Sequence, residues 1–157
     1  MTPAIETAKK ANIAFRVHEY QHDPTVKSYG EEAADALGIS HDRVFKTLVA
    51  ATDGNPAQLA VAVIPVAKRL DLKALAAAMG VKKMAMANQG DAERATGYVI
   101  GGISPLGQRK RLPLLMDESA LACETIYVSA GKRGLEIELA PRDLLTLSKG
   151  TTAAIAR

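Results

Sequence analysis

Val44-Phe45-Lys46-Thr47-Leu48-Val49 opens the part of the chain that sets its fold class, because this apolar run predicts a β-strand over 44–52. Asp53-Gly54-Asn55-Pro56 follows the run and has the composition of a tight turn. The next apolar run, Gln58–Ile64, predicts a second strand that returns after this turn. The centre of the chain is therefore expected to be β-sheet.

The segments on either side alternate between helical and strand patterns. Helix starts are indicated by Thr2-Pro3, by the capping box Ser28 and Glu31, and by Asp71. Helices are predicted over 3–10, 28–37, 71–79 and 88–96, with a terminal helix from Pro141, and further strands over 15–20, 98–100, 112–116, 125–129 and 135–139. This order predicts one mixed α/β (α+β) domain over 1–157, with a curved mixed sheet or barrel-like core and surrounding helices, and fits a doubly wound fold poorly.

Length and composition limit the class of protein. The chain has 157 residues, 48% of them hydrophobic, which is enough for one buried core without a disulfide or metal staple. The apolar run Leu59–Ala67 is too short to span a membrane, and Met1–Glu6 lacks the pattern of a signal peptide. Cys123 is the single cysteine, which excludes an internal disulfide. A cytoplasmic protein with no membrane contact is expected.

The net charge of +3 permits an anionic partner without requiring one. The positive charges form short clusters, namely Lys68-Arg69, Lys82-Lys83, Arg109-Lys110-Arg111 and Lys132-Arg133. Each cluster is expected to be a solvated surface patch, with phosphate binding as the alternative.

Standard catalytic motifs are incomplete in this sequence. Gly102 and Gly107 have the glycine spacing of a P-loop, but Gln108 stands where that motif needs a lysine. The segment Gly102–Leu106 lacks the second glycine of a nucleophile elbow. Cys123 has no basic neighbour to activate its thiol, so it is expected to be a small core residue.

The three histidines do not have the spacing of metal ligands, and they are expected to lie at the surface or to be hydrogen-bonded: His18, His22 and His41. No metal site and no cofactor is predicted.

Two other features carry chemical meaning. The loop Gly101–Gly107 can either turn backbone N–H groups toward an oxyanion or be an ordinary tight loop. Lys46 alternates with Val44 and Leu48 along its strand, so it either faces inward, where it needs an anionic partner, or extends its ammonium to water. The residues alone leave both alternatives open.

The sequence also resembles the YbaK family of free-standing aminoacyl-tRNA editing proteins, which is related to the editing domain of bacterial prolyl-tRNA synthetase. The resemblance runs essentially from end to end. It is carried by Met1–Ala4, Val44–Leu48, Leu59–Val63, Asp71–Lys73, Thr96–Tyr98, Gly101–Gln108, Ile126–Ser129 and Gly131–Ile137.

The resemblance implies a mixed fold and removal of cysteine from cysteinyl-tRNA(Pro), and it leaves action on cysteinyl-tRNA(Cys) open. In such members the thiol of the substrate is thought to attack its own ester, so the site needs no nucleophile of its own. The family pattern places Lys46 and the Gly101 backbone at the catalytic centre. It places the following residues around the substrate: Tyr20, Tyr29, Thr47, Gly102, Ser129 and Glu136. Glu136 departs from the aspartate that is common among relatives.

The expected partners are misacylated tRNA(Pro) and, in a transient ternary complex, prolyl-tRNA synthetase. Two other functions stay open. The first is removal of another small residue, such as alanine from alanyl-tRNA(Pro), which would need an activated water. The second is a non-catalytic module that binds tRNA or a synthetase.

Overall fold

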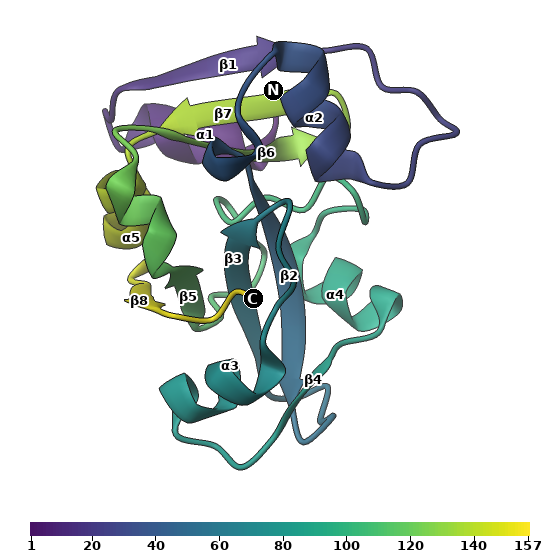
Figure 1. The fold of residues 1–157 in the computed structure, drawn as a ribbon, viewed down its shortest axis with the longest axis vertical. Helices are drawn as coiled ribbons and strands as arrows, with labels where there is room; N and C mark the ends of the chain where they lie inside the picture. The colour runs from purple at the N-terminus through teal and green to yellow at the C-terminus, as the bar shows by residue number, and fades with distance from the viewer.

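The computed structural model describes residues 1–157 as five α-helices and eight β-strands (Figure 1). The helices are α1 (Pro3–Lys10), α2 (Tyr29–Leu37), α3 (Leu72–Met79), α4 (Gln89–Thr96) and α5 (Pro141–Ser148). The strands are β1 (Phe15–Glu19), β2 (Phe45–Thr52), β3 (Leu59–Pro65), β4 (Met84–Met86), β5 (Leu114–Asp117), β6 (Ile126–Lys132), β7 (Leu135–Leu139) and β8 (Thr151–Ala153). Two short 3₁₀ helices, His41–Arg43 and Glu118–Ala122, complete the fold.

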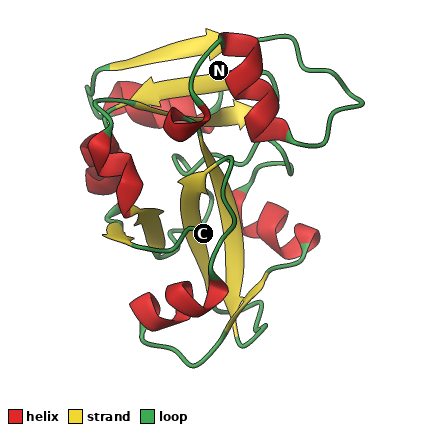
Figure 2. Cartoon of the chain, viewed as in Figure 1, coloured by secondary structure: helices red, strands yellow, loops and turns green.

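The strands form two separate sheets, which Figure 2 shows one above the other. The smaller sheet has the order β1-β7-β6 and is antiparallel. The larger has the order β4-β2-β3-β5-β8, with antiparallel pairs around β2 and parallel pairs on both sides of β5. The predicted mixed α/β class is confirmed, whereas the barrel-like alternative is wrong, because both sheets keep open edges and no ladder closes them.

The core lies on both faces of the larger sheet. On one face Val49 and Val63 join Val128 and Ile137 of the smaller sheet in a cluster of 23 buried residues. On the other face α3 packs against the alanines and Ile64 of β2 and β3. All seven residues of β3 are buried, because a strand covered on both sides needs apolar residues at every position.

Most of the predicted helix starts are confirmed by hydrogen bonds to the N-cap side chains. The side chains of Thr2, Asp71 and Asn88 accept hydrogen bonds from backbone N–H groups in the first turns of α1, α3 and α4. The prediction of a capping box at α2 is wrong, since Ser28 occupies the N-cap position but its side chain forms no capping hydrogen bond. Glu31, its supposed partner, lines a pocket instead.

Residues 98–100 form a loop rather than the predicted strand. The ring of Tyr98 is buried in the core, and its hydroxyl donates a hydrogen bond of 2.6 Å to the Leu106 carbonyl, which pins the segment to the glycine-rich loop. The strands β4 and β8 were not predicted, because each has only three residues and no clear alternation. No helix in the structure has the length and apolar character of a membrane span.

Candidate active site

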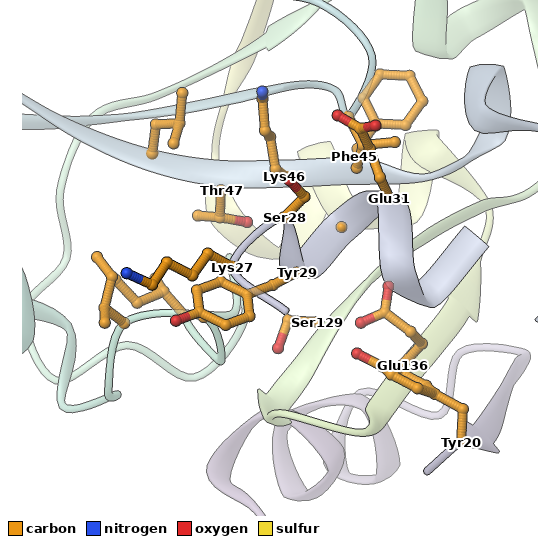
Figure 3. A pocket seen from close by; sticks show the side chains of 16 residues that line it. Tyr20, Lys27, Ser28, Tyr29, Glu31, Phe45, Lys46, Thr47, Ser129 and Glu136 are labelled. Atoms are coloured by element: carbon orange, nitrogen blue, oxygen red, sulfur yellow. The ribbon is translucent and has the colours of Figure 1, made fainter. Parts of the chain in front are cut away.

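A pocket of about 260 Å³ opens where α2, β2, the glycine-rich loop and the smaller sheet meet (Figure 3). Its volume is just below the range of typical small-molecule sites. Sixteen residues from these elements line it: Tyr20, Lys27, Ser28, Tyr29, Gly30, Glu31, Phe45, Lys46, Thr47, Leu48, Val66, Ile100, Gly101, Ile103, Ser129 and Glu136.

Seven of the eight predicted site residues line this pocket, although they come from distant parts of the chain: Tyr20, Tyr29, Lys46, Thr47, Gly101, Ser129 and Glu136. Gly102 lies outside the pocket lining. Its N–H bonds to the Val99 carbonyl, and a Cβ at this glycine would lie 3.0 Å from the Lys132 Cα. The structure thus gives Gly102 a packing contact beneath the loop rather than a place on the pocket wall.

Glu136 supplies a buried acid to the pocket. The residue is only 6% exposed, and its carboxyl forms no ion pair and no hydrogen bond with the protein. Burial raises the pKa of its carboxyl to about 8, so the group is mostly protonated at neutral pH. Its register partner across β6 and β7 is Ser129, and Figure 3 shows the Tyr20 hydroxyl beside the acid.

The hydroxyl of Thr47 is completely buried and has no hydrogen-bond partner in the protein. Such orphaned groups are rare, because a buried hydroxyl loses its hydration without compensation. The nearby Ser129 Oγ accepts a hydrogen bond of 3.1 Å from the Gly131 N–H, and its own proton has no acceptor in the protein. The pocket therefore carries unused hydrogen-bonding capacity at Thr47, Ser129 and Glu136.

Lys46 is half-buried at the pocket and has no carboxylate within ion-pair distance. Figure 3 shows its ammonium on the opposite side of β2 from Thr47, as strand alternation requires. Burial lowers the pKa of the ammonium, while Glu31 raises it and Arg69 lowers it further. The lysine therefore has neither an anionic partner in the protein nor full exposure to water.

Gly101 has a backbone that no other residue fits. Its φ is +86°, and a Cβ there would lie 2.5 Å from the Arg133 Nε and 2.9 Å from the Tyr29 ring. The N–H groups of Ile100 and Gly102 are hydrogen-bonded, whereas the Gly101 N–H has no partner in the protein. The loop thus leaves two backbone donors without a protein partner in residues that line the pocket, the N–H groups of Gly101 and Ile103.

Arg133 contacts the part of the pocket lining formed by Tyr29 and the segment Ile100–Gly101. The sequence predicted that this residue would be a solvated surface cation. Its guanidinium lies 4.5 Å from the centre of the Tyr29 ring and donates two hydrogen bonds to the Ile100 carbonyl. Other pocket residues missed from the sequence include Lys27 and Glu31. Their positions depend on where α2 docks, which no local pattern specifies.

The remaining reactive side chains lie outside the pocket. The prediction for the histidines is confirmed, since each ring is hydrogen-bonded to a carboxylate: His18 to Glu138, His22 to Glu32 and His41 to Asp35. Cys123 is partly buried and packs against the core, as predicted. No group of three or more His, Cys, Asp and Glu side chains could hold a metal ion.

A family model described as the aminoacyl-tRNA editing domain matches residues 23–147, which contain most of the pocket. The chain belongs to this family. A curated relative is 43% identical over 98% of this chain and 92% of its own length, and by name it is a candidate Cys-tRNA(Pro)/Cys-tRNA(Cys) deacylase, EbsC of Enterococcus faecalis. The predicted resemblance is thereby confirmed.

Solved structures confirm the editing-domain fold. The hypothetical protein APE2540 matches with a TM-score of 0.87 at 24% identity, over 99% of this chain and 100% of that one. A candidate trans-editing enzyme for prolyl-tRNA synthetase matches with a TM-score of 0.83 at 22% identity, over 100% of this chain and 99% of that one. At these identities the two structures bear on the fold alone.

Proposed function

We propose that this editing-domain protein is a deacylase that removes cysteine from cysteinyl-tRNA(Pro). The observation that carries the proposal is the end-to-end relationship to EbsC, whose name gives Cys-tRNA(Pro) and Cys-tRNA(Cys) as its substrates. The volume of the pocket, about 260 Å³, supports it, because an aminoacyl group and part of the terminal ribose fill such a space. Cysteine and proline are similar in size, so a synthetase needs a second site to separate them.

The pocket supports a mechanism in which the substrate supplies its own nucleophile. No cysteine and no histidine lines the pocket, and the three imidazoles of the chain are hydrogen-bonded to carboxylates rather than to a pocket hydroxyl. In the proposed step the cysteinyl sulfur attacks the ester carbonyl, and a C–S bond forms as the bond to the ribose oxygen breaks. The thiol proton ends on that ribose oxygen, which leaves free tRNA and a cyclic thiolactone. The reaction is then of the lyase type, and water opens the ring afterwards.

The protein contributes orientation and charge stabilisation to this step. The unpartnered Gly101 N–H is the donor that we assign to the carbonyl oxygen as it becomes negative. Thr47 and Ser129 offer free hydrogen-bonding groups to the aminoacyl end, and Glu136 with Tyr20 forms the polar wall beside it. Lys46 is assigned to the terminal phosphate or ribose of the tRNA, because it is a half-buried cation without a protein partner.

Recognition of the tRNA body requires more than this pocket. We propose that tRNA(Pro) is presented in a transient complex with prolyl-tRNA synthetase in the cytoplasm, and that surface cations such as Lys82 and Lys83 contact its backbone. Contacts with tRNA phosphates make affinity fall as salt increases. A pull-down of the synthetase with and without tRNA(Pro) tests this part of the proposal.

The experiment on the function compares deacylation of cysteinyl-tRNA(Pro) and alanyl-tRNA(Pro) by the purified protein in the presence of a chelator. Loss of cysteine alone is the expected result. Loss of alanine at a similar rate contradicts the thiol-assisted step, because alanine has no nucleophile. Survival of both esters, together with salt-dependent tRNA binding, contradicts catalysis and leaves a binding module.

A further inference from the structure

Arg133, in the turn between β6 and β7, contacts other parts of the protein instead of extending into solvent. Arg133 is partly buried and has no carboxylate partner. Its Nη2 and Nε donate hydrogen bonds of 2.7 and 3.1 Å to one acceptor, the Ile100 carbonyl. The central carbon of its guanidinium lies 4.5 Å from the centre of the Tyr29 ring, whereas the neighbouring Lys132 is exposed. One residue thus ties the turn, α2 and the glycine-rich loop together.

The bond to Ile100 fixes the peptide unit that carries the Gly101 N–H. A peptide is planar and trans, so its C=O and N–H point in opposite directions. A carbonyl held by Arg133 therefore directs the Gly101 N–H away from the guanidinium. That N–H has no partner in the protein, although Gly101 lines the pocket.

A second anchor holds the other side of the same residue. Glu93 of α4 accepts a hydrogen bond of 2.8 Å from the Ile100 N–H. Ile100 is thereby fixed at its N–H by an anion and at its carbonyl by a cation. A charged donor on a carbonyl also polarises the peptide and strengthens its N–H as a donor.

We propose that Arg133 is a positioning residue, which holds the Ile100–Gly101 peptide so that the Gly101 N–H faces the carbonyl oxygen of the substrate. The inference rests on the proposed deacylation and goes beyond it by assigning a residue outside the pocket lining. Arg133 touches neither the substrate nor the reacting atoms. Its effect is therefore on the rate of the bound complex rather than on binding.

Three variants test the proposal. Arg133→Gln removes the charge, and Arg133→Lys keeps the charge but loses the two hydrogen bonds to one carbonyl and the guanidinium contact with the Tyr29 ring. Lys132→Gln is the matched control in the same turn. Single-turnover deacylation of cysteinyl-tRNA(Pro) separates the rate of the bound complex from affinity. Loss of one oxyanion donor costs about 10²–10³-fold in rate, so misplacing it is expected to cost on the order of 10- to 100-fold.

The expected result is that both Arg133 variants lose rate with affinity changed less than about threefold, while Lys132→Gln retains the wild-type rate. If Arg133→Lys restores the rate, or if the loss lies in affinity and grows with salt, Arg133 is a phosphate contact and the proposal is overturned. Circular dichroism and thermal melts show whether each variant is folded.

A second readout does not depend on activity. The amide resonance of Gly101 in ¹⁵N-labelled protein reports the orientation and polarisation of that peptide. The proposal predicts a shift of this resonance in both Arg133 variants and none in Lys132→Gln. An unchanged Gly101 resonance overturns the proposal even if activity falls. Conversely, a wild-type protein that leaves cysteinyl-tRNA(Pro) intact disproves the proposed function, and the resonance alone then decides the role of Arg133.

Discussion

Glu136 makes the stability of this protein depend on pH in an unusual direction. Burial raises the pKa of its carboxyl to about 8, against 4.5 for the free acid, so the folded chain holds a proton that the unfolded chain releases. The contribution of Glu136 to stability is therefore full below about pH 4.5 and is lost as pH rises toward 8. Over this range the free energy of unfolding decreases by at most about 1.4 kcal/mol per pH unit because of Glu136.

Replacing Glu136 by glutamine keeps the shape and removes this titration. We expect Glu136→Gln to gain stability relative to wild type between pH 5 and pH 8, as measured by urea unfolding at several pH values. Glu118, which is exposed on the surface, provides the control, since Glu118→Gln is expected to keep the pH dependence of wild type. Parallel stability curves for wild type and Glu136→Gln would show that the acid is ionised in the folded state.

A comparison of alanine variants at Gly38 and Gly101 distinguishes the effect of backbone strain from the effect of changing the site. Both have positive φ, but a Cβ at Gly38 meets nothing within 4 Å, whereas one at Gly101 collides with Arg133 and Tyr29. Gly38→Ala is expected to cost about 1 kcal/mol of stability and to leave deacylation unchanged. Gly101→Ala is expected to reduce deacylation at least about 100-fold. Equal activity of the two variants in the same assay would argue against the assigned role of the Gly101 peptide.

Alanine variants of Lys46 and Lys68 test the proposed contact between Lys46 and the end of the tRNA, with Lys68 as the control. Lys46 lines the pocket, while Lys68 is exposed and lies outside the pocket. Lys46→Ala is expected to weaken binding of cysteinyl-tRNA(Pro) and to reduce the salt dependence of that binding by about one phosphate contact. Lys68→Ala is expected to bind as wild type does, as measured by filter binding at several salt concentrations.

At the scale of elements, the two helix starts at Ser28 and Asp71 differ although both have a capping residue. The Asp71 side chain accepts a hydrogen bond of 3.0 Å from the Ala74 N–H, and Ser28 accepts none. Asp71→Ala is expected to lower the free energy of unfolding by about 1 kcal/mol, and Ser28→Ala by much less. Thermal and urea unfolding measure both, and a similar loss in the two variants would mean that Ser28 does cap α2.

The helix and strand boundaries that local chemistry determines could be predicted from the sequence. Thr2-Pro3 starts α1, Gly38 and Gly80 end α2 and α3 in the left-handed conformation, and the alternation of Leu135–Leu139 matches β7. Residues 98–100 could not, because the buried Tyr98 is held by the distant Leu106 carbonyl. Tertiary contacts decided that segment against its β-propensity.

The site was predictable only in part for the same reason. The family resemblance identified seven residues that the structure brings to one pocket, from Tyr20 to Glu136. No local signal distinguishes Arg133 from Lys132 in the same turn, yet one contacts Tyr29 and Ile100 while the other faces water. Likewise, the missing hydrogen bond of Thr47 appears only when the pocket is assembled.

At the scale of the whole molecule, the site lies where the two sheets meet. The smaller sheet supplies Ser129 and Glu136, the larger sheet supplies Lys46 and Thr47, and the glycine-rich loop completes the wall. A pocket built from separate elements can present donors from several directions to one small ester. The absence of cysteine and histidine from its lining is consistent with a reaction in which the substrate provides the nucleophile.

The most direct test of that reaction compares cysteinyl-tRNA(Pro) with 2-aminobutyryl-tRNA(Pro), in which a methyl group replaces the thiol at nearly the same size. Single-turnover assays with both esters at one enzyme concentration measure the contribution of the sulfur alone. We expect the cysteinyl ester to be lost and the aminobutyryl ester to survive for the same time. Cleavage of both at similar rates would show that water is the nucleophile and would contradict thiol-assisted editing.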